Sequence, residues 1–277
     1  MAIGSPGSQR QEVSWFSAVL RRALWVLLNY GSLLALLACW EIVARLQIVS
    51  PYLLPSLSDV LARSWAELGD GTFLLNLGET LRRALLGFSI AVVAGVALGL
   101  LIARNTTAEW FLGPLVSLGF PLPKITFLPI FILWFGVYDV SKVTMVVCDS
   151  IFPVITATIA GAQGVERQLI WSARNLGARE HHLWYTIILP AAAPQILSGI
   201  EVALPIALIV AVVTEMMLGG SGLGGAMMGS WRFADSVGVF SGLLQLSVVG
   251  FILIQMMSAI RRRVLKWHPE TQAGLVS

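Results

Sequence analysis

The chain has 277 residues, of which 57% are hydrophobic and only 12% are charged. Soluble domains carry roughly 45–50% apolar and about 25% charged residues, so the composition excludes an ordinary soluble protein. Apolar stretches of about 20 residues, long enough to cross ~30 Å of hydrocarbon, recur along the chain and predict an all-α protein with about six membrane spans.

The N-terminal region combines a polar tail with the first predicted span. Residues 1–20 begin with a short polar stretch that contains Gly, Ser and Pro, and they predict a flexible cytoplasmic tail. Residues 24–44 form an apolar stretch long enough to span, which argues against a cleaved signal peptide. Turn signals at Pro51 and Pro55 follow, and from Ser58 the pattern becomes amphipathic, as in a helix that lies at the membrane interface on the outer side.

The second and third spans differ in regularity. Residues 81–103 contain Gly95 and Gly99, a spacing that lets another helix approach closely. Residues 110–135 contain four prolines and cannot form one regular helix. Broken backbone at membrane depth is tolerated only where it is packed in protein or lines a cavity.

The remaining spans are predicted at residues 142–162, 195–218 and 237–260, which puts the membrane domain at residues 21–265 and a cytoplasmic tail at 266–277. Between the fourth and fifth spans lies a polar, charged interruption, residues 164–190, hereafter the coupling loop. Within it, apolar residues at helical spacing and a central Gly177 predict two short helices joined by a turn; these residues are Leu169, Ala173, Leu176 and Leu183. Pro190 and Pro194 are expected to limit the second helix.

The basic residues predict the orientation. Eleven of the 18 Lys and Arg residues fall before the first predicted span, in residues 104–109, in the coupling loop or after the sixth predicted span. An excess of Lys and Arg marks the cytoplasmic side. Both termini and the coupling loop are therefore predicted to lie in the cytoplasm, in a multi-pass membrane protein.

The coupling loop also carries a recognisable signature. It begins with Trp171, Ser172 and Ala173, and Gly177 follows after three intervening residues. After nine more residues it ends with Ile-Ile-Leu-Pro, in which Leu189 and Pro190 are the last two. This resembles the E-A-A-x3-G-x9-I-x-L-P loop of the membrane subunits of bacterial binding-protein-dependent ABC importers. Trp171 and Ser172 replace the usual Glu and Ala.

The resemblance extends over most of the chain from about residue 50, and is strongest with the branch that serves sulfonates, taurine and nitrate. It implies the type I permease fold in the bacterial inner membrane, with two copies forming one pathway. It also implies a separate ATPase subunit, which the coupling loop would contact, and an external solute-binding protein that delivers the solute. A thiamine-precursor-type or other small solute stays open as the alternative.

Ionisable residues inside spans are candidates for functional positions, because they are costly in hydrocarbon. Glu41 and Glu201 lie near span ends and can reach the interface. Lys124 in the broken span and Asp149 in the fourth span either pair with each other or line the pathway. Glu215 precedes the glycine-rich segment 219–225, where Gly222 and Gly224 are further candidates for the pathway or its gate. This segment is expected to be a flexible external loop.

Other chemistries find no support in the sequence. The G-x-G-x-x-G at Gly220, Gly222 and Gly225 lacks the strand and helix of a dinucleotide site, and no P-loop motif occurs. His181, His182 and His268 lack metal-ligand spacing. No cofactor, metal, nucleic acid or catalytic residue is therefore predicted. A membrane-embedded enzyme or a self-sufficient secondary transporter is the rival hypothesis, but neither a catalytic cluster nor internal repeats are visible.

Overall fold

A computed structural model describes residues 31–267, which are helical apart from short turns and loops, with no strand among them. The predicted N-tail, the start of the first predicted span and His268 lie outside the described residues. Contacts divide the chain after Arg63, so the two parts are described separately.

In the first part, residues 31–45 are helical, and a loop leads to α2 (Leu57–Gly69). Glu41 joins these segments: its carboxylate accepts from Arg45 Nε at 2.6 Å and from Ser58 Oγ at 2.9 Å. The indole of Trp40 donates to the Pro55 carbonyl at 3.0 Å. Glu41 thus has a local structural role.

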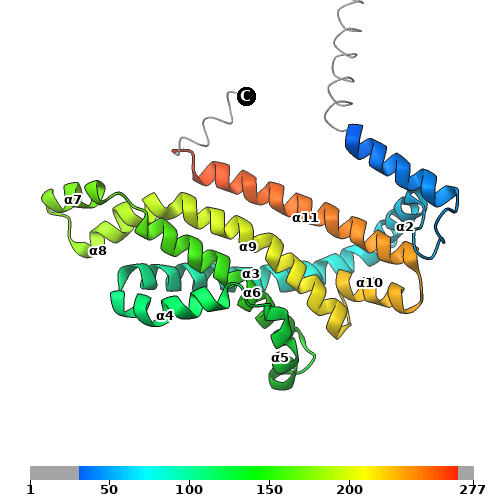
Figure 1. Cartoon of the computed structure of the whole chain (residues 1–277), viewed down its shortest axis with the longest axis horizontal. Coiled ribbons are helices and arrows are strands. Elements are labelled where there is room, and N and C mark those ends of the chain that lie inside the picture. The colour runs from blue at the N-terminus through cyan, green and yellow to red at the C-terminus, as the bar shows by residue number, and fades with distance from the viewer. Residues whose placement is uncertain (1–30, 268–277) are drawn as a thin grey trace, which may run out of the picture. The chain divides into compact units, whose positions relative to one another are not determined.

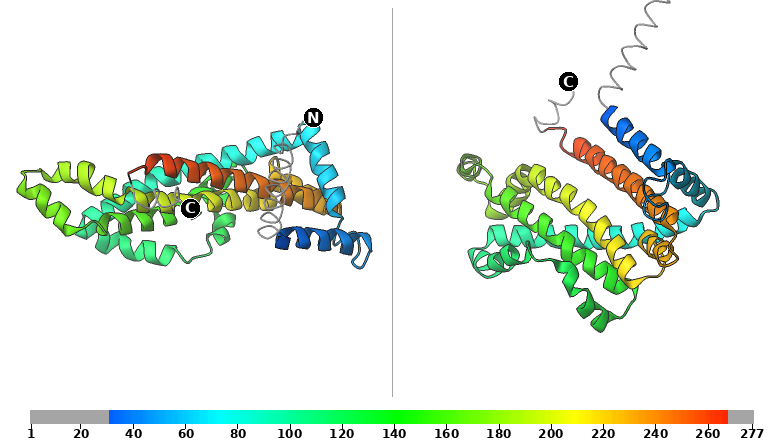
Figure 2. Two further views of the ribbon diagram at one scale, coloured as in Figure 1. Left: turned by 90° about the horizontal axis from the view of Figure 1, so that it is seen from above. Right: turned by 45° about the vertical axis from the view of Figure 1, so that its right-hand side comes forward.

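The second part is a helix bundle centred on α3 (Thr72–Arg104), α6 (Asp139–Gln163) and α9 (Leu189–Leu218). These three helices pack along one another, and α10 (Leu223–Arg232) and α11 (Ser236–Val264) pack on α9 (Figure 1). Figure 2 shows the same arrangement from two other sides. The buried core draws small and aliphatic side chains from α3, α6, α9 and α11, including Ala84, Val146, Ala207 and Val249.

Glycines on α3 set its distance from α6. A Cβ at Gly87, Gly95 or Gly99 would lie 2.6–2.9 Å from side-chain atoms of Val146, Val154 or Thr158, closer than real Cβ contacts. Apolar burial gives little driving force between helices in lipid, so close packing of this kind supplies much of the association energy. The prediction that Gly95 and Gly99 serve helix packing is confirmed.

The third predicted span is broken, as its prolines require. It consists of α4 (Thr106–Gly119), a 3-10 turn (Lys124–Phe127) and α5 (Leu128–Phe135), and its two halves meet at 96°. The side chain of Asn105 caps α4 by accepting from the Thr107 and Ala108 amides.

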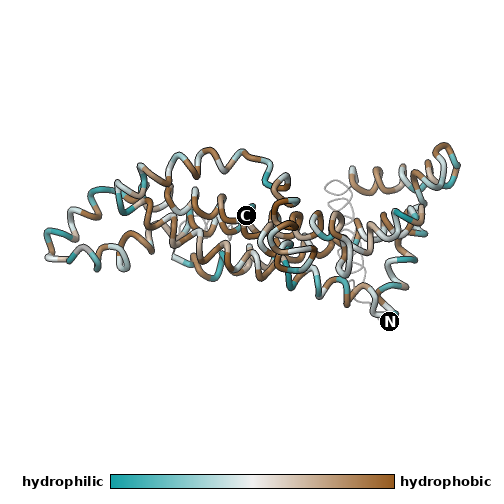
Figure 3. The backbone as a smooth tube through the Cα atoms, turned by 90° about the horizontal axis from the view of Figure 1, so that it is seen from below, coloured by the Kyte–Doolittle hydropathy of each residue, from teal (hydrophilic) through white to brown (hydrophobic). Residues whose placement is uncertain are grey.

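Within the described residues, four helices are long and apolar enough to cross a membrane, and the bent pair gives a fifth candidate. All are longer than predicted, α3 beginning nine residues before residue 81. Figure 3 shows that hydrophobic residues dominate these helices, whereas the part carrying α7 and α8 contains many hydrophilic residues.

Candidate functional site

The coupling loop folds as two short helices around a glycine turn. These helices are α7 (Arg167–Asn175) and α8 (Glu180–Leu183), and they project beyond the ends of α4 and α6 (Figure 1). Gly177 has φ +83, which favours glycine, and its amide donates to the Arg174 carbonyl at 2.9 Å. The predicted helix–turn–helix is thus present.

One face of α7 packs inward and the other is left open. Ile170 packs against a small cluster of Ala162, Val165 and Ile188, and Ala173 is half-buried. Trp171 is 58% exposed, and its neighbour Ser172 is exposed as well. Trp171 therefore does not pack beneath its own helix.

The apolar residues at helical spacing in the coupling loop do not share one buried face. Leu183 is buried, but Leu169 is 49% exposed and Leu176 is 89% exposed. The inner face of α7 is centred between Ile170 and Ala173, which leaves Leu169 at its edge. Leu176 follows the last turn of α7, where the chain changes direction, so its spacing from Leu169 and Ala173 no longer indicates which way its side chain faces.

The prolines at the end of the loop do not interrupt the helix, contrary to expectation. Helical structure runs continuously from His181 to Leu218. A π-helical turn (Trp184–Ile188) precedes Pro190, and the Leu189 amide donates to the Trp184 carbonyl five residues back. A π-helical turn is wider than an α-helical one. It can therefore accommodate a following proline, which has no backbone N–H to donate and whose ring would clash with the carbonyl one turn earlier. Leu189 and Pro190 therefore join the coupling loop to α9 without a hinge.

The coupling loop also contacts the end of α3. The Arg104 guanidinium lies over the Trp184 ring, 5.8 Å from its centroid, a distance at which cation and ring attract. Arg104 is the last residue of α3. The loop is thus connected to three long helices, covalently to α6 and α9 and by this contact to α3.

A buried charge cluster occupies the opposite end of the bundle. It comprises the buried Arg83, Lys142 and Glu215 and the partly exposed Glu79 and Asp139, contributed by α3, α6 and α9. Arg83 has a side chain only 3% exposed, and it donates to Glu215 Oε1 at 2.6 Å, Asp139 Oδ1 at 2.7 Å and Glu79 Oε2 at 3.0 Å. Glu215 is fully buried. A buried charge is tolerated when it is paired and hydrogen-bonded in this way.

The cluster holds the backbone of the glycine-rich segment 219–225. Lys142 donates to the Gly219 carbonyl at 3.0 Å and Arg83 donates to the Ser221 carbonyl at 2.7 Å. Glu215 accepts from the Gly224 amide at 3.1 Å.

Two residues of α3 complete this set of contacts. Asn76 accepts from the Gly222 amide at 3.1 Å, and Thr80 accepts from the Leu223 amide at 2.8 Å while donating to Glu215. The segment is therefore fixed at both ends, and its second half starts α10. The expectation of a flexible loop is wrong.

Gly222 and Gly224 are required by space as well as by backbone angle. Gly222 has φ +115, and a Cβ there would lie 2.4 Å from the Glu215 carboxylate. A Cβ on Gly224 would lie 2.2 Å from the Val212 carbonyl. Of the five residues proposed for the pathway or gate, the structure thus brings three together: Glu215, Gly222 and Gly224.

Lys124 and Asp149 form a separate pair. Lys124 Nζ lies 3.1 Å from Asp149 Oδ1 and 4.7 Å from the Phe152 ring centroid, and it donates to the Phe120 carbonyl at 3.1 Å. The Lys124 side chain is only 9% exposed. Of the two alternatives for these residues, the described contacts favour pairing, which fixes the break between α4 and α5 against α6.

Sequence reasoning missed Arg83, Asp139 and Lys142 as members of a site. One signal was available: Arg82 and Arg83 lie within an apolar stretch beside Glu79, and an arginine in a span requires a partner. The identity of that partner, Glu215, depends on helix packing across 132 positions of sequence. Among the described residues, no three His, Cys, Asp or Glu side chains gather as a metal site would require.

Comparison with known proteins gives a family match. Residues 95–266 match the family described as "Binding-protein-dependent transport system inner membrane component". The taurine transport system permease protein TauC of Escherichia coli is 31% identical over 252 residues, 89% of this chain and 92% of that protein.

Two further relatives have similar identity. The putative aliphatic sulfonates transport permease protein SsuC of Bacillus subtilis is 32% identical over 84% of each chain. The formylaminopyrimidine transport permease protein ThiX of Halalkalibacterium halodurans is 32% identical over 85% of this chain and 93% of that protein. Among solved structures, a chain of the MetNI methionine ABC transporter in an inward-facing conformation matches with a TM-score of 0.62 at 18% identity, covering 72% of this chain and 98% of that chain.

Proposed function

The chain belongs to the family of inner membrane components of binding-protein-dependent transport systems, and we propose that it works with a separate ATPase subunit and an external solute-binding protein to import a small organic anion. As a member of this family of ABC importer permeases, it is a transport protein. The proposal concerns its partners, its orientation and its solute.

The exposed coupling loop is the observation that carries this proposal. The loop presents Leu169, Trp171 and Leu176 to its surroundings at one end of the bundle, and apolar side chains on a projecting helix are suited to a protein groove. Its connection to α9 through the π turn, with no hinge at Pro190, would pass a movement of the loop into the membrane helices.

The assembly we propose contains two copies of this chain, two ATPase subunits and one solute-binding protein. The bundle described here carries its coupling loop at one end only, so one copy would supply half of a pathway. The concentration of Lys and Arg in the loop and tails supports a cytoplasmic location for both termini. No catalytic role is assigned to this chain, and ATP hydrolysis is assigned to the partner.

The proposed solute is a sulfonate, since relatives named for taurine and for aliphatic sulfonates match over most of the chain. A pyrimidine-type thiamine precursor is the second candidate, because the formylaminopyrimidine permease is equally similar. Both are small polar solutes that could pass through the same fold.

Trp171 provides the test of the interaction with the ATPase. Exposed Trp residues that become buried in interfaces cost about 2 kcal/mol or more on truncation, which corresponds to roughly 30-fold in affinity. Trp171→Ala is expected to leave the chain folded and membrane-inserted while weakening co-purification of the ATPase subunit by about that factor. Trp231→Ala is the matched control, since Trp231 is 67% exposed on α10. Equal capture of the ATPase by Trp171→Ala and the wild type would reject Trp171 as an interface residue.

Solute uptake tests the rest of the proposal. The chain, the ATPase and the solute-binding protein are reconstituted in proteoliposomes with ATP on the ATPase side, and uptake of taurine, short alkanesulfonates and formylaminopyrimidine is compared. Sulfonate uptake that requires all three proteins is the expected result. Uptake of formylaminopyrimidine alone would select the second candidate, and uptake without the ATPase would contradict the division of labour.

A further inference from the structure

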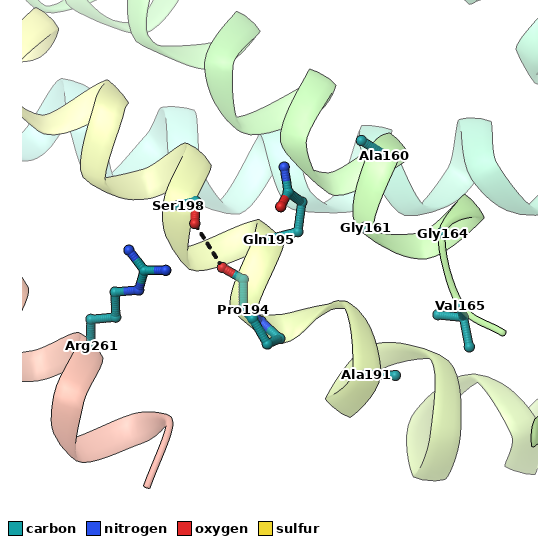
Figure 4. Close-up of a pocket in the computed structure, with 9 residues that line it drawn as sticks. All are labelled: Ala160, Gly161, Gly164, Val165, Ala191, Pro194, Gln195, Ser198 and Arg261. Carbon is teal, nitrogen blue, oxygen red and sulfur yellow. Dashed lines mark hydrogen bonds between the residues drawn. The ribbon is translucent and has the colours of Figure 1, made fainter. Parts of the chain in front are cut away.

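Two adjoining cavities lie between α6 and α9, away from the charge cluster. One has a volume of about 370 Å³ and is partly closed by Arg261 of α11 (Figure 4). The other, of about 390 Å³, continues toward Phe120 and Val202. Because both are lined by Ala160, Gln195 and Ser198, they form one groove, hereafter the α6–α9 groove.

The end of the groove nearest the coupling loop is polar. Arg261 reaches from α11 toward α9 and donates to Glu201 Oε2 at 2.6 Å, with 30% of its side chain exposed. Ser198 lies beside it and donates to the Pro194 carbonyl (Figure 4). The amide group of Gln195 is exposed and makes no hydrogen bond with any residue in 31–267. An amide in this position can donate to and accept from a ligand.

The other end of the groove is apolar. Pro153, Ala157, Val202 and the ring of Phe120 line it. Small residues maintain the close contact of the two helices beneath it: a Cβ on Gly199 would lie 2.4 Å from Ala157 Cβ. The groove thus has a hydrogen-bonding end with a guanidinium group and an aliphatic end, separated along the helix axes.

We propose that the α6–α9 groove binds the transported solute, a small aliphatic oxyanion whose charged head lies at Gln195, Ser198 and Arg261 and whose alkyl chain lies along Ala157 and Val202. This inference rests on the proposed function and specifies where the solute is held within the membrane. It assigns Gln195 as a hydrogen-bonding residue and Val202 as a determinant of chain length.

The Glu201–Arg261 pair explains why such a site would bind weakly. The Glu201 carboxylate compensates the Arg261 charge, so an anion meets the N–H donors of Gln195 and Arg261 without a full positive charge. A site on a transport pathway has to release its solute as readily as it takes it up. Removal of Arg261 should therefore lower the preference of the groove for anions over cations, and removal of Glu201 should raise it.

Thiol labelling tests the groove whichever solute the chain transports. In the full chain assembled with its ATPase, Cys39 and Cys148, the only two cysteines, are replaced by Ser, and Ser198→Cys is introduced. Labelling rates are measured with 2-sulfonatoethyl methanethiosulfonate, an aliphatic sulfonate, and with its trimethylammonium counterpart. Ile209→Cys is the control, because Ile209 is 58% exposed on the same helix and lines neither cavity.

We expect Ser198→Cys to react with both reagents and Ile209→Cys to react with neither. Arg261→Gln should lower the ratio of anionic to cationic labelling about five-fold, and Glu201→Gln should raise it by a similar factor, as one unit charge within several ångströms predicts. An unreactive Ser198→Cys would mean that the groove is closed to water, and would overturn the proposal.

Protection by solutes tests the binding mode. Butanesulfonate should slow labelling of Ser198→Cys at a concentration several-fold lower than methanesulfonate, because each buried methylene raises affinity by up to about four-fold. Val202→Trp should remove this difference while methanesulfonate still protects, whereas Ile209→Trp should preserve it. Labelling that no sulfonate slows would identify a water-filled crevice only and overturn the proposal. Failure of the proposed function would appear separately, as loss of ATPase capture or uptake in the wild type.

Discussion

At the scale of single residues, Arg83 is the position on which most contacts of the buried charge cluster depend. It pairs with three carboxylates, from α3, α6 and α9, and donates to one backbone carbonyl of the glycine-rich segment. Its neighbour Arg82 pairs with Glu79 and Asp139 as well, yet 46% of its side chain is exposed. Burial is the main difference between the two adjacent arginines, so their substitutions form a matched pair.

We expect Arg83→Met to destabilise the protein by about 3–5 kcal/mol, because it removes the direct ion-pair partner of the fully buried Glu215. Arg82→Met should cost at most about 1 kcal/mol, as exposed ion pairs do. The double variant Arg83→Met with Glu215→Gln should recover part of the loss. Thermal denaturation in detergent, followed for all four proteins, measures these differences. Similar losses of stability in Arg82→Met and Arg83→Met would show that burial of the Arg83–Glu215 pair does not determine how much it stabilises the protein.

At the scale of elements, the chain uses glycine for two different purposes. Gly177 supplies a backbone angle, since it has φ +83 and no atom within 4 Å of the position a Cβ would take. Gly87, Gly95 and Gly99 have ordinary helical angles and supply space for α6. The two roles predict different tolerance to substitution.

Gly177→Val should reduce the ATPase activity that the solute-binding protein stimulates in the assembled complex. The reason is strain alone: a left-handed conformation costs a residue with a Cβ about 1–2 kcal/mol, which favours straightening of the turn. A Cβ at Gly177 would meet no atom of this chain within 4 Å, so strain and not a clash distinguishes the variant. Gly177→Asn is the control, because Asn adopts this conformation more readily. Full stimulation in Gly177→Val would argue against a need for this turn.

Gly95→Ala should lower the melting temperature by about 2–5 °C, since a methyl group 2.9 Å from Val154 forces α3 and α6 apart. Gly78→Ala, on the same helix with nothing within 4 Å, should leave the melting temperature unchanged or raise it, because Ala favours helix by about 1 kcal/mol over Gly. Helix propensity favours Ala over Gly at both positions, so opposite changes in melting temperature would isolate the effect of packing between α3 and α6. A stabilised Gly95→Ala would contradict close α3–α6 packing.

At the scale of the whole molecule, the coupling loop and the buried charge cluster lie at opposite ends of the same helices. The 30 residues of α9 extend about 45 Å at 1.5 Å per residue. Glu215 lies near one end of α9, and the other end continues into the coupling loop. Helix α3 parallels this arrangement, with Arg104 against Trp184 at one end and Arg83 toward the other. Helix α6 does the same, from Lys142 against Gly219 to Gln163 beside the loop, so three packed helices connect the loop to the glycine-rich segment.

The division of labour predicts the behaviour of the isolated chain. The sequence contains no P-loop to hold ATP phosphates. The purified chain alone should therefore show no ATP turnover approaching about 1 per second, the lower end of the range for typical enzymes. ATP hydrolysis should appear only when the ATPase subunit is added. A phosphate-release assay on the chain purified from a host lacking the partner measures this. Sustained turnover by the chain alone would contradict the proposed partnership.

The sequence by itself determined the class of protein, the approximate positions of the apolar spans after residue 70 and the break in the third span. These follow from local properties: runs of apolar residues, prolines that remove backbone donors, and Gly177 at a turn. The family resemblance followed from the spacing around Gly177, which does not depend on packing.

Tertiary structure decided the partners of the buried charges, because Arg83 and Glu215 are joined by contacts between α3 and α9 that no local pattern encodes. It also decided that the glycine-rich segment is fixed, since side chains from other helices bind its backbone. For the same reason the α6–α9 groove was not predictable: its lining residues converge only when α6, α9 and α11 pack together.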